Sequence, residues 1–365
     1  MNPERIPLHA LSLIDVAQAL LAGGKGLLAM DESTTTCNQR FASAGIEQTV
    51  DARRAYRELL LTTPGLGASI SGVILYDETI RQRRADGMPF TKILADAGIL
   101  VGIKVDIGAK DLAGHPGEKV TEGLDGLRER LNAYRDMGAR FAKWRGVIGI
   151  GFEDGAGGDG GPSRPSRGCI AANAHALARY AALCQEAGLV PIVEPEVLMD
   201  GSHTLARCAE VTEAVLRQVF DQLAAQRVVL EAVILKPNMV VSGSTCNAQA
   251  TVSEVADATL QCLLRVVPAA VPGIAFLSGG QTGELATARL NAMHLRFRVA
   301  NSASLPWPLS FSFARALQHP ALEIWAGKDE HRVAAQQALL HRARCNQAAL
   351  RGEYRDEYSA AMESP

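Results

Sequence analysis

Short apolar runs alternate with segments of helical spacing about eight times along this chain. Each run is compact and apolar, which is typical of a strand covered on both faces. The eight runs are Gly26–Met30, Gly72–Leu75, Leu100–Val105, Phe141–Val147, Leu189–Val193, Ala232–Leu235, Ile274–Leu277 and Leu309–Phe313. The segments between them include helices predicted over Gly123–Met137, Ala171–Ala187 and Leu205–Ala225. This alternation predicts an α/β fold with a parallel sheet closed as a single (β/α)8 TIM barrel.

An open, doubly wound sheet is the alternative fold for the same alternation. Such a sheet usually has a Gly-rich phosphate loop after an early strand, and this chain has none there. A G-x-G-x-x-G pattern does occur later, at Gly155, Gly157 and Gly160, but no helical pattern follows it at once. We therefore interpret residues 153–167 as a mobile Gly-rich insertion, and a dinucleotide loop is the other interpretation.

The length of 365 residues suits one barrel domain over residues 1–350, because such barrels often run past about 250 residues. An extra helix is predicted from Asp329 to Leu350, followed by a polar, mobile tail over residues 351–365. The net charge of −2 gives no general attraction to nucleic acid or to an anionic membrane. None of the seven cysteines lies in a C-x-x-C pair, and we recognise no signal peptide. These two observations predict a reduced, cytoplasmic setting without disulfides.

Ionisable residues lie at the carboxyl ends of the predicted strands, which form the active-site face of such barrels. The set comprises Asp31, Lys104, Asp106, Lys143, Arg145, Glu194, Glu196, Lys236 and Arg315. Lys143 and Arg145 are two residues apart, so they share one face of their strand and Trp144 takes the other. Charges rarely lie in buried strands without a reason. The set therefore predicts either a catalytic centre or a buried ion-pair network that closes the barrel top.

A lysine at a strand end suits chemistry that needs a nucleophilic amine. At its ordinary pKa of ~10.4 a lysine is a poor nucleophile, and burial and neighbouring cations free the amine. Lys236 ends its strand directly before Pro237, and we expect Lys143 to be its cationic neighbour. An amine that attacks a carbonyl also needs carboxylates to move protons, and Glu194 and Glu196 can supply them.

Two groups of residues predict anion sites at the barrel mouth. Ser278, Gly279 and Gly280 follow a strand and precede a predicted helix, and Arg315 follows the neighbouring strand. Barrels often bind phosphate between these last two loops. A second group across the mouth comprises Lys104 and Arg145 with the hydroxyls of Ser33 and Thr36. Two anion sites with an amine between them predict a small substrate with a phosphate at each end.

Metal and serine-hydrolase chemistry find no support in the sequence. None of the eight histidines forms an H-x-H or H-E-x-x-H pair, and none lies at a predicted strand end. A G-x-S-x-G elbow is also absent. We therefore expect no metal and no other cofactor.

Several motifs spread over the chain resemble one family, the metal-free class I fructose-1,6-bisphosphate aldolases that act through a Schiff base. The motifs are GKGLLAMDES at Gly24–Ser33, VGIKVD at Val101–Asp106, FAKWR at Phe141–Arg145, PIVEPEVL at Pro191–Leu198, LKPNM at Leu235–Met239, FLSGGQ at Phe276–Gln281 and FSFARALQ at Phe311–Gln318. The resemblance implies reversible cleavage of fructose 1,6-bisphosphate into dihydroxyacetone phosphate and glyceraldehyde 3-phosphate. It also implies a homotetramer.

The resemblance implies a role for each matching residue. Lys236 corresponds to the Schiff-base lysine, Glu194 to the general acid/base, and Asp31 to the carboxylate near the scissile bond. Glu196 and Lys143 correspond to electrostatic partners of that centre. The residues implied at the C1 phosphate are Ser278, Gly279, Gly280, Ser312 and Arg315. The residues implied near the C6 phosphate are Ser33, Thr36, Arg40, Lys104 and Arg145.

The chain departs from the family pattern at Ala314, where the family often has glycine, and at its end, where well-studied members carry a terminal tyrosine. Tyr354 and Tyr358 lie near the end, either as surface residues or with Tyr358 reaching the barrel mouth. Two other functions stay open from the sequence: a Schiff-base lyase or transferase acting on a sugar monophosphate, and a non-catalytic sugar-phosphate-binding protein.

Overall fold

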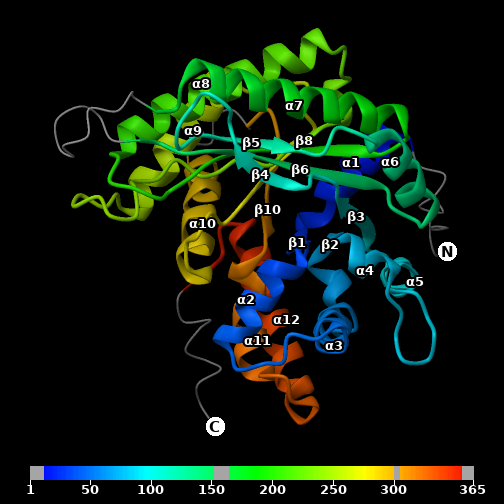
Figure 1. Cartoon of the computed structure of the whole chain (residues 1–365). Coiled ribbons are helices and arrows are strands. Elements are labelled where there is room, and N and C mark those ends of the chain that lie inside the picture. Colours follow the sequence, from blue (N-terminus) through cyan, green and yellow to red (C-terminus); the bar gives the residue numbers. More distant parts are fainter. Residues whose placement is uncertain (1–11, 152–163, 300–304, 356–365) are drawn as a thin grey trace, which may run out of the picture.

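The computed structural model describes residues 12–151, 164–299 and 305–355 (Figure 1). Eight parallel strands form a closed barrel in the order β1-β10-β9-β8-β7-β6-β3-β2. Their bounds are β1 Gly26–Ala29, β2 Ile70–Leu75, β3 Leu100–Lys104, β6 Phe141–Ile148, β7 Val190–Val197, β8 Ile234–Leu235, β9 Gly273–Phe276 and β10 Leu309–Phe313. The eight predicted apolar runs are therefore the eight barrel strands, and the predicted TIM barrel is confirmed.

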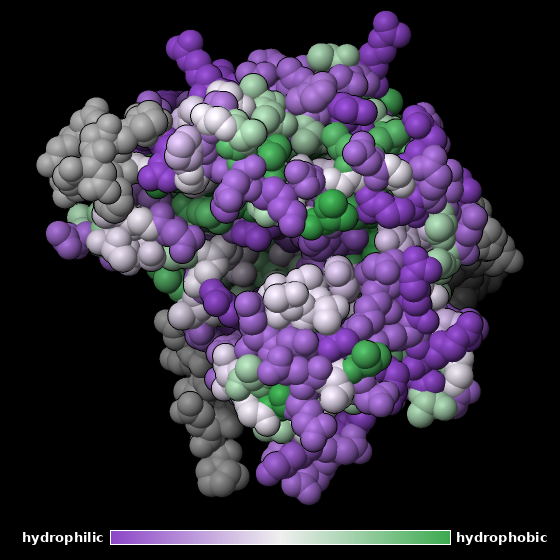
Figure 2. All heavy atoms as spheres, viewed as in Figure 1, coloured by the Kyte–Doolittle hydropathy of each residue, from purple (hydrophilic) through white to green (hydrophobic). Residues whose placement is uncertain are grey.

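Helices surround the barrel on its outside (Figure 1). The long helices α7 and α8 pack together along one side, and α11 and α12 pack together on another. The helices of eight or more residues are α1 Leu13–Leu21, α2 Thr34–Ser43, α3 Val50–Leu61, α6 Leu127–Asp136, α7 Arg167–Glu186, α8 Leu205–Ala225, α9 Val252–Val266, α10 Gly283–Val299, α11 Arg315–Trp325 and α12 Arg332–Ala349. The shorter ones are α4 Asp77–Arg81 and α5 Phe90–Asp96. Polar residues cover most of the face in Figure 2, which is hollowed across its middle.

The periodic patterns in the sequence do not predict two elements of the fold, a first helix and an antiparallel hairpin. Helix α1 packs against β1, β2, β7 and β9, and its buried side chains join the core inside the barrel. It begins with a capping box in which Ser12 and Asp15 satisfy each other's backbone N–H, a signal that the sequence does carry. The hairpin of β4 Gly108–Asp111 and β5 Lys119–Glu122 follows β3 as an antiparallel insertion.

The barrel interior is filled by large and small side chains that fit together. Phe141 of β6 is fully buried inside, and a Cβ atom at Gly102 of neighbouring β3 would lie 2.1 Å from its ring. Glycine at this strand position therefore makes room for an aromatic ring. On the outer side, Trp144 packs against Tyr180 of α7 with 5.5 Å between the ring centroids. Side chains thus fill the barrel interior, and the site lies at the carboxyl ends of the strands.

Parts of the predicted insertion and tail lie outside the described residues, namely 153–163 and 356–365 with Tyr358. Within the described residues the insertion ends sooner than predicted, because Ser166 caps α7 and Arg167 is its first residue. Tyr354 is buried, and its backbone N–H donates to Asn291 Oδ1 at 3.0 Å. The surface position considered for Tyr354 is therefore wrong, because the chain after α12 returns to α10.

Candidate active site

A cavity of about 790 Å³ opens at the carboxyl end of the barrel strands. Every site residue predicted from the sequence lines it: Asp31, Ser33, Thr36, Arg40, Lys104, Lys143, Arg145, Glu194, Glu196, Lys236, Ser278, Gly279, Gly280, Ser312 and Arg315. These residues come from strands, loops and the helices α2 and α11, and they span almost the whole sequence. The closed barrel brings them together because all its parallel strands end at one face.

Lys236 holds its amine against a carboxylate inside the cavity. It directly follows β8, and its backbone N–H donates to Val193 O of β7 at 2.8 Å. Its Nζ lies 3.0 Å from Glu194 Oε1, and both side chains are about 95% buried, with 4% and 5% exposed. The backbone ladder thus fixes the amine where only a neighbouring side chain or a ligand in the cavity can reach it.

A second lysine joins this pair to Asp31. Lys143 of β6 places its Nζ 2.6 Å from Asp31 Oδ2 and 3.1 Å from Glu194 Oε2. Arg145, two residues further along the strand, also lines the cavity and pairs with Glu196. The shared face of Lys143 and Arg145 is therefore as the strand period predicts.

The charges in this centre keep one another ionised. Burial raises the pKa of Asp31 and of Glu194, but the ammonium groups of Lys143 and Lys236 lower both further than burial raises them. Burial lowers the pKa of Lys143, and the carboxylates of Asp31 and Glu194 outweigh it and raise that pKa. Both carboxylates are thus ionised, with Lys143 as a fixed cation between them.

One end of the cavity offers hydroxyls, backbone and a cation. Gly279 and Gly280 have φ angles of 52° and 84°, a left-handed turn that glycine adopts without strain. A Cβ atom at Gly280 would lie 3.4 Å from Arg315 Nη2, so the guanidinium lies directly beside this turn. Ser312 is buried, and its hydroxyl has no hydrogen-bond partner among the described residues. Helix α10 begins at Gly283, three residues after Gly280, and the N-terminus of a helix favours an anion.

The other end carries cations that are already paired with carboxylates. Lys104 Nζ lies 2.5 Å from Asp106 Oδ1, and Arg40 Nη1 lies 2.5 Å from Glu32 Oε1. Ser33 caps α2 by accepting from the backbone N–H of Thr36 at 3.3 Å. An ion-pair network therefore does exist at the barrel top, and it lines an open cavity instead of closing it.

Sequence reasoning missed several residues of this site. Glu32 and the rim residues Tyr76, Asp77, Arg81 and Tyr134 also line the cavity. Burial and the bond to Asp77 raise the pKa of Tyr134 to about 12, so its phenol stays protonated. Glu32 and Tyr76 did have a sequence signal, because Glu32 lies beside Asp31 in GKGLLAMDES and Tyr76 directly follows a predicted strand. Asp77, Arg81 and Tyr134 lie on α4 and α6, where no motif marks them.

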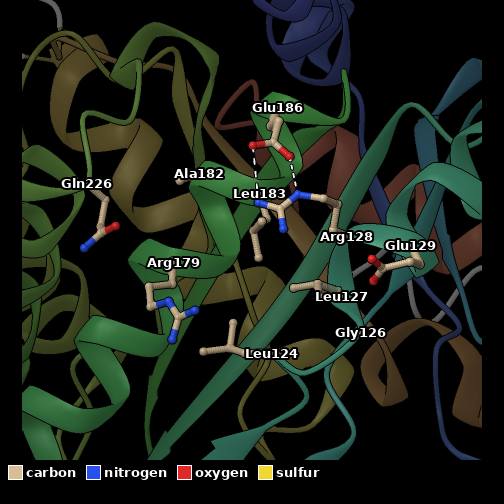
Figure 3. Close-up of a pocket in the computed structure, with 10 residues that line it drawn as sticks. All are labelled: Leu124, Gly126, Leu127, Arg128, Glu129, Arg179, Ala182, Leu183, Glu186 and Gln226. Carbon is tan, nitrogen blue, oxygen red and sulfur yellow. Dashed lines mark hydrogen bonds and ion pairs between the residues drawn. The ribbon is translucent and has the colours of Figure 1, made fainter.

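A second hollow lies outside the barrel between α6 and α7 (Figure 3). Arg128 and Glu186 form an ion pair across it, with 2.6 Å between Nε and Oε1, and both side chains are 57% exposed. None of the predicted site residues lines this hollow. Within the described ranges no group of His, Cys, Asp and Glu is placed to hold a metal ion. No helix among the described residues is long and apolar enough to cross a membrane.

A buried lysine amine held beside a carboxylate at the carboxyl end of a parallel barrel is the arrangement of an enzyme that forms a Schiff base with a carbonyl substrate. The family model described as fructose-bisphosphate aldolase class-I matches residues 12–364. The chain therefore belongs to the family of class I fructose-bisphosphate aldolases.

Individual relatives are similar in sequence to this chain over nearly its whole length. A probable fructose-bisphosphate aldolase class 1 of Xanthomonas campestris is 58% identical over 94% of this chain and 98% of the relative. The cytosolic fructose-bisphosphate aldolase 6 of Arabidopsis thaliana is 49% identical over 94% of this chain and 92% of its own. The solved fructose-bisphosphate aldolase of Plasmodium falciparum, in complex with TRAP and an inhibitor, matches with a TM-score of 0.89 and 44% identity over 97% of this chain and 98% of that one.

The paired charges predict how the pH dependence responds to loss of Lys143. In Lys143→Met the cation that lowers the pKa of Glu194 and Asp31 is gone, so both carboxylates protonate at higher pH. The acidic limb of kcat/KM for fructose 1,6-bisphosphate cleavage should move up by about one pH unit or more. The position of the limb is the readout, because the maximal rate also falls.

Lys143→Arg is the control, since it keeps the positive charge and should leave the limb near its wild-type position. An acidic limb at the wild-type pH in Lys143→Met contradicts the assigned electrostatic role.

Proposed function

We propose that Lys236 forms the Schiff base in the reversible cleavage of fructose 1,6-bisphosphate to dihydroxyacetone phosphate and glyceraldehyde 3-phosphate. Membership of the family makes the chain an aldehyde-lyase of glycolysis and gluconeogenesis that uses a lysine Schiff base. The observation that supports the residue assignment best is the buried Lys236 Nζ, 3.0 Å from Glu194 Oε1, inside a cavity with cations at two ends.

In the first step, Glu194 takes a proton from the Lys236 ammonium group, and the freed amine attacks the C2 carbonyl carbon. A proton passes from the nitrogen to the C2 oxygen, which gives a carbinolamine. Glu194 then returns its proton to the C2 hydroxyl, which leaves as water, so that a protonated imine remains. The Oε1 atom of Glu194 is within hydrogen-bond reach of the amine, as a general acid/base must be. Its lowered pKa means that it enters the step as a base.

In the second step, the imine draws the electrons of the C3–C4 bond toward C2. A base takes the proton of the C4 hydroxyl, C4 leaves as the aldehyde of glyceraldehyde 3-phosphate, and C3 becomes part of an enamine. Asp31 is the carboxylate we propose beside this bond, and it is ionised because Lys143 lies 2.6 Å away. Protonation at C3 and hydrolysis of the imine release dihydroxyacetone phosphate.

The two cationic ends are proposed to bind the two phosphates. Ser278, Gly279, Gly280, Ser312 and Arg315 would hold the C1 phosphate beside the left-handed turn. Ser33, Thr36, Arg40, Lys104 and Arg145 would hold the C6 phosphate across the cavity. Glu196 pairs with Arg145, so it is proposed to orient that cation as well as to stabilise the carbinolamine with Lys143.

We also propose a cytoplasmic homotetramer built from one barrel domain over residues 1–350. Membership of the class I aldolase family supports the homotetramer. The name of the Arabidopsis relative supports the cytoplasmic location. The partners we propose are thus sugar bisphosphates and other copies of the chain, with no nucleic acid and no membrane.

Lys236→Met should remove nearly all cleavage of fructose 1,6-bisphosphate while the fold persists, because methionine fills the space of the lysine stem without an amine. The measurement is release of dihydroxyacetone phosphate, with circular dichroism to check the fold.

Wild-type activity should be unchanged by EDTA, because the proposed centre uses no metal ion. Substantial turnover by folded Lys236→Met enzyme, or metal-dependent activity, would refute the proposed centre.

Arg315→Ala should weaken both cleavage of the bisphosphate and binding of dihydroxyacetone phosphate. A charge-assisted hydrogen bond to phosphate contributes roughly 1.5–3 kcal/mol, so a loss on the order of ten- to a hundredfold in each is expected. Arg296→Ala is the matched control, because Arg296 pairs with Asp257 on the outer surface and lies outside the cavity. Equal affinity of wild type and Arg315→Ala for both ligands would remove Arg315 from the phosphate site.

A further inference from the structure

Glu32 is a buried carboxylate at the cavity wall that the proposed reaction does not use. Its side chain is 5% exposed, and it holds three partners at once. Its Oε1 accepts from Arg40 Nη1 at 2.5 Å and from Gln318 Nε2 at 2.8 Å. Its Oε2 accepts from Arg57 Nη1 at 2.7 Å. A buried carboxylate with three charged or amide donors is a rigid anchor for all of them.

The first contact of Glu32 reaches one end of the cavity. Arg40 lies on α2, lines the cavity and is 27% exposed at its side chain. Glu32 is the carboxylate paired with Arg40 in the described part of the chain. The long arginine side chain has many rotamers, so the ion pair fixes where its remaining N–H groups point. The position of this cation therefore depends on Glu32.

The second contact reaches the opposite end. Gln318 lies on α11, three residues after Arg315, which is the first residue of that helix. Its Nε2 donates both to Glu32 Oε1 and to Ala29 O of β1, the latter at 2.6 Å, and its Oε1 accepts from Tyr56. Gln318 is 1% exposed. The helix start that presents Arg315 is thus tied to β1 and to the same carboxylate that holds Arg40.

The third partner explains why Glu32 is charged and stationary. Arg57 of α3 is 2% exposed, and its Nη2 also donates to Glu32 O at 3.4 Å. Burial raises the pKa of Glu32, and Arg57 and Arg40 together lower it further. Arg57 lines no part of the cavity, so its role is to hold Glu32 from behind.

We propose that Glu32 is a positioning residue that holds Arg40 at a fixed distance from Arg315, the arginine proposed at the other phosphate. The proposal rests on the function proposed above. A substrate with a phosphate at each end then binds well only when both arginines are in place, whereas a substrate with the C1 phosphate alone needs Arg315 and not Arg40. Glu32 thereby determines the preference for a bisphosphate over a monophosphate.

The test compares fructose 1,6-bisphosphate with fructose 1-phosphate in Glu32→Gln. Arg40 loses its charged partner, while the bond of Gln318 to Ala29 O still holds α11. The KM for the bisphosphate should rise about tenfold, and the KM for fructose 1-phosphate should change far less. Adding Glu32→Gln to Arg40→Ala should raise the bisphosphate KM no further, because both act on one contact. The pH profile should keep both limbs, since Glu32 transfers no proton.

Gln318→Met tests separately the contacts by which Gln318 holds the start of α11. It frees the start of α11, so the KM should rise by a similar factor for both substrates, because both carry the C1 phosphate. This variant also keeps Glu32 paired with Arg40 and Arg57, so it remains informative if Glu32→Gln fails to fold.

Glu78→Gln is the matched control for an unpaired buried arginine. Glu78 binds Arg53 through both oxygens, at 2.8 and 2.7 Å, and lies outside the cavity. It should lower the melting temperature without changing the ratio of the two KM values. The same ratio in Glu32→Gln as in Glu78→Gln overturns the positioning role. Wild-type enzyme that cleaves neither sugar phosphate would instead refute the proposed function, so the two failures are distinguishable.

Discussion

The rest of the site depends on two ion pairs of one ammonium group, that of Lys143, which contacts both Asp31 and Glu194. A buried ion without a partner costs several kcal/mol, and removing one member of a buried pair typically costs ~3–5 kcal/mol. Two lysines and two carboxylates placed alternately avoid this cost and hold each other at fixed distances. Glu194 also contacts Lys236, so the same arrangement that stabilises the buried charges places a base beside the nucleophile. A structural ion-pair network and a catalytic centre are thus one set of residues here.

The register of the parallel strands explains how these side chains meet. Lys143 of β6 lies opposite Ile192 of β7, and Arg145 lies opposite Glu194. Lys143 therefore contacts Glu194 diagonally, two residues along the neighbouring strand, and a long side chain spans that step. Leu235 pairs with Val193 in the next ladder, which puts Lys236 beside Glu194. A slip of one residue in either ladder would turn the amine or the carboxylate away from the cavity.

Much of this arrangement can be predicted from the sequence, because a strand is formed by residues that are close together along the chain. The eight apolar runs, the shared face of Lys143 and Arg145, and the position of Lys236 at a strand end all follow from short-range periods, and each is seen in the fold. The links among Glu32, Arg57 and Gln318 do not follow, because they join residues 25 and 286 positions apart. Helix α1 was missed because no strand precedes it to mark its place in the alternation. Tyr354 was misjudged because a polar composition does not show that one aromatic ring is buried.

The central claim is that one particular amine among three cavity lysines reacts with the substrate carbonyl. The most direct measurement reduces the enzyme with borohydride in the presence of dihydroxyacetone phosphate and locates the added mass by peptide mapping. Only an imine is converted to a stable adduct, so the label marks the nucleophile itself. The structure predicts the adduct on Lys236, which lies beside Glu194 at the end of β8. An adduct on Lys143 or Lys104, or no adduct on an enzyme that is active, would contradict the account.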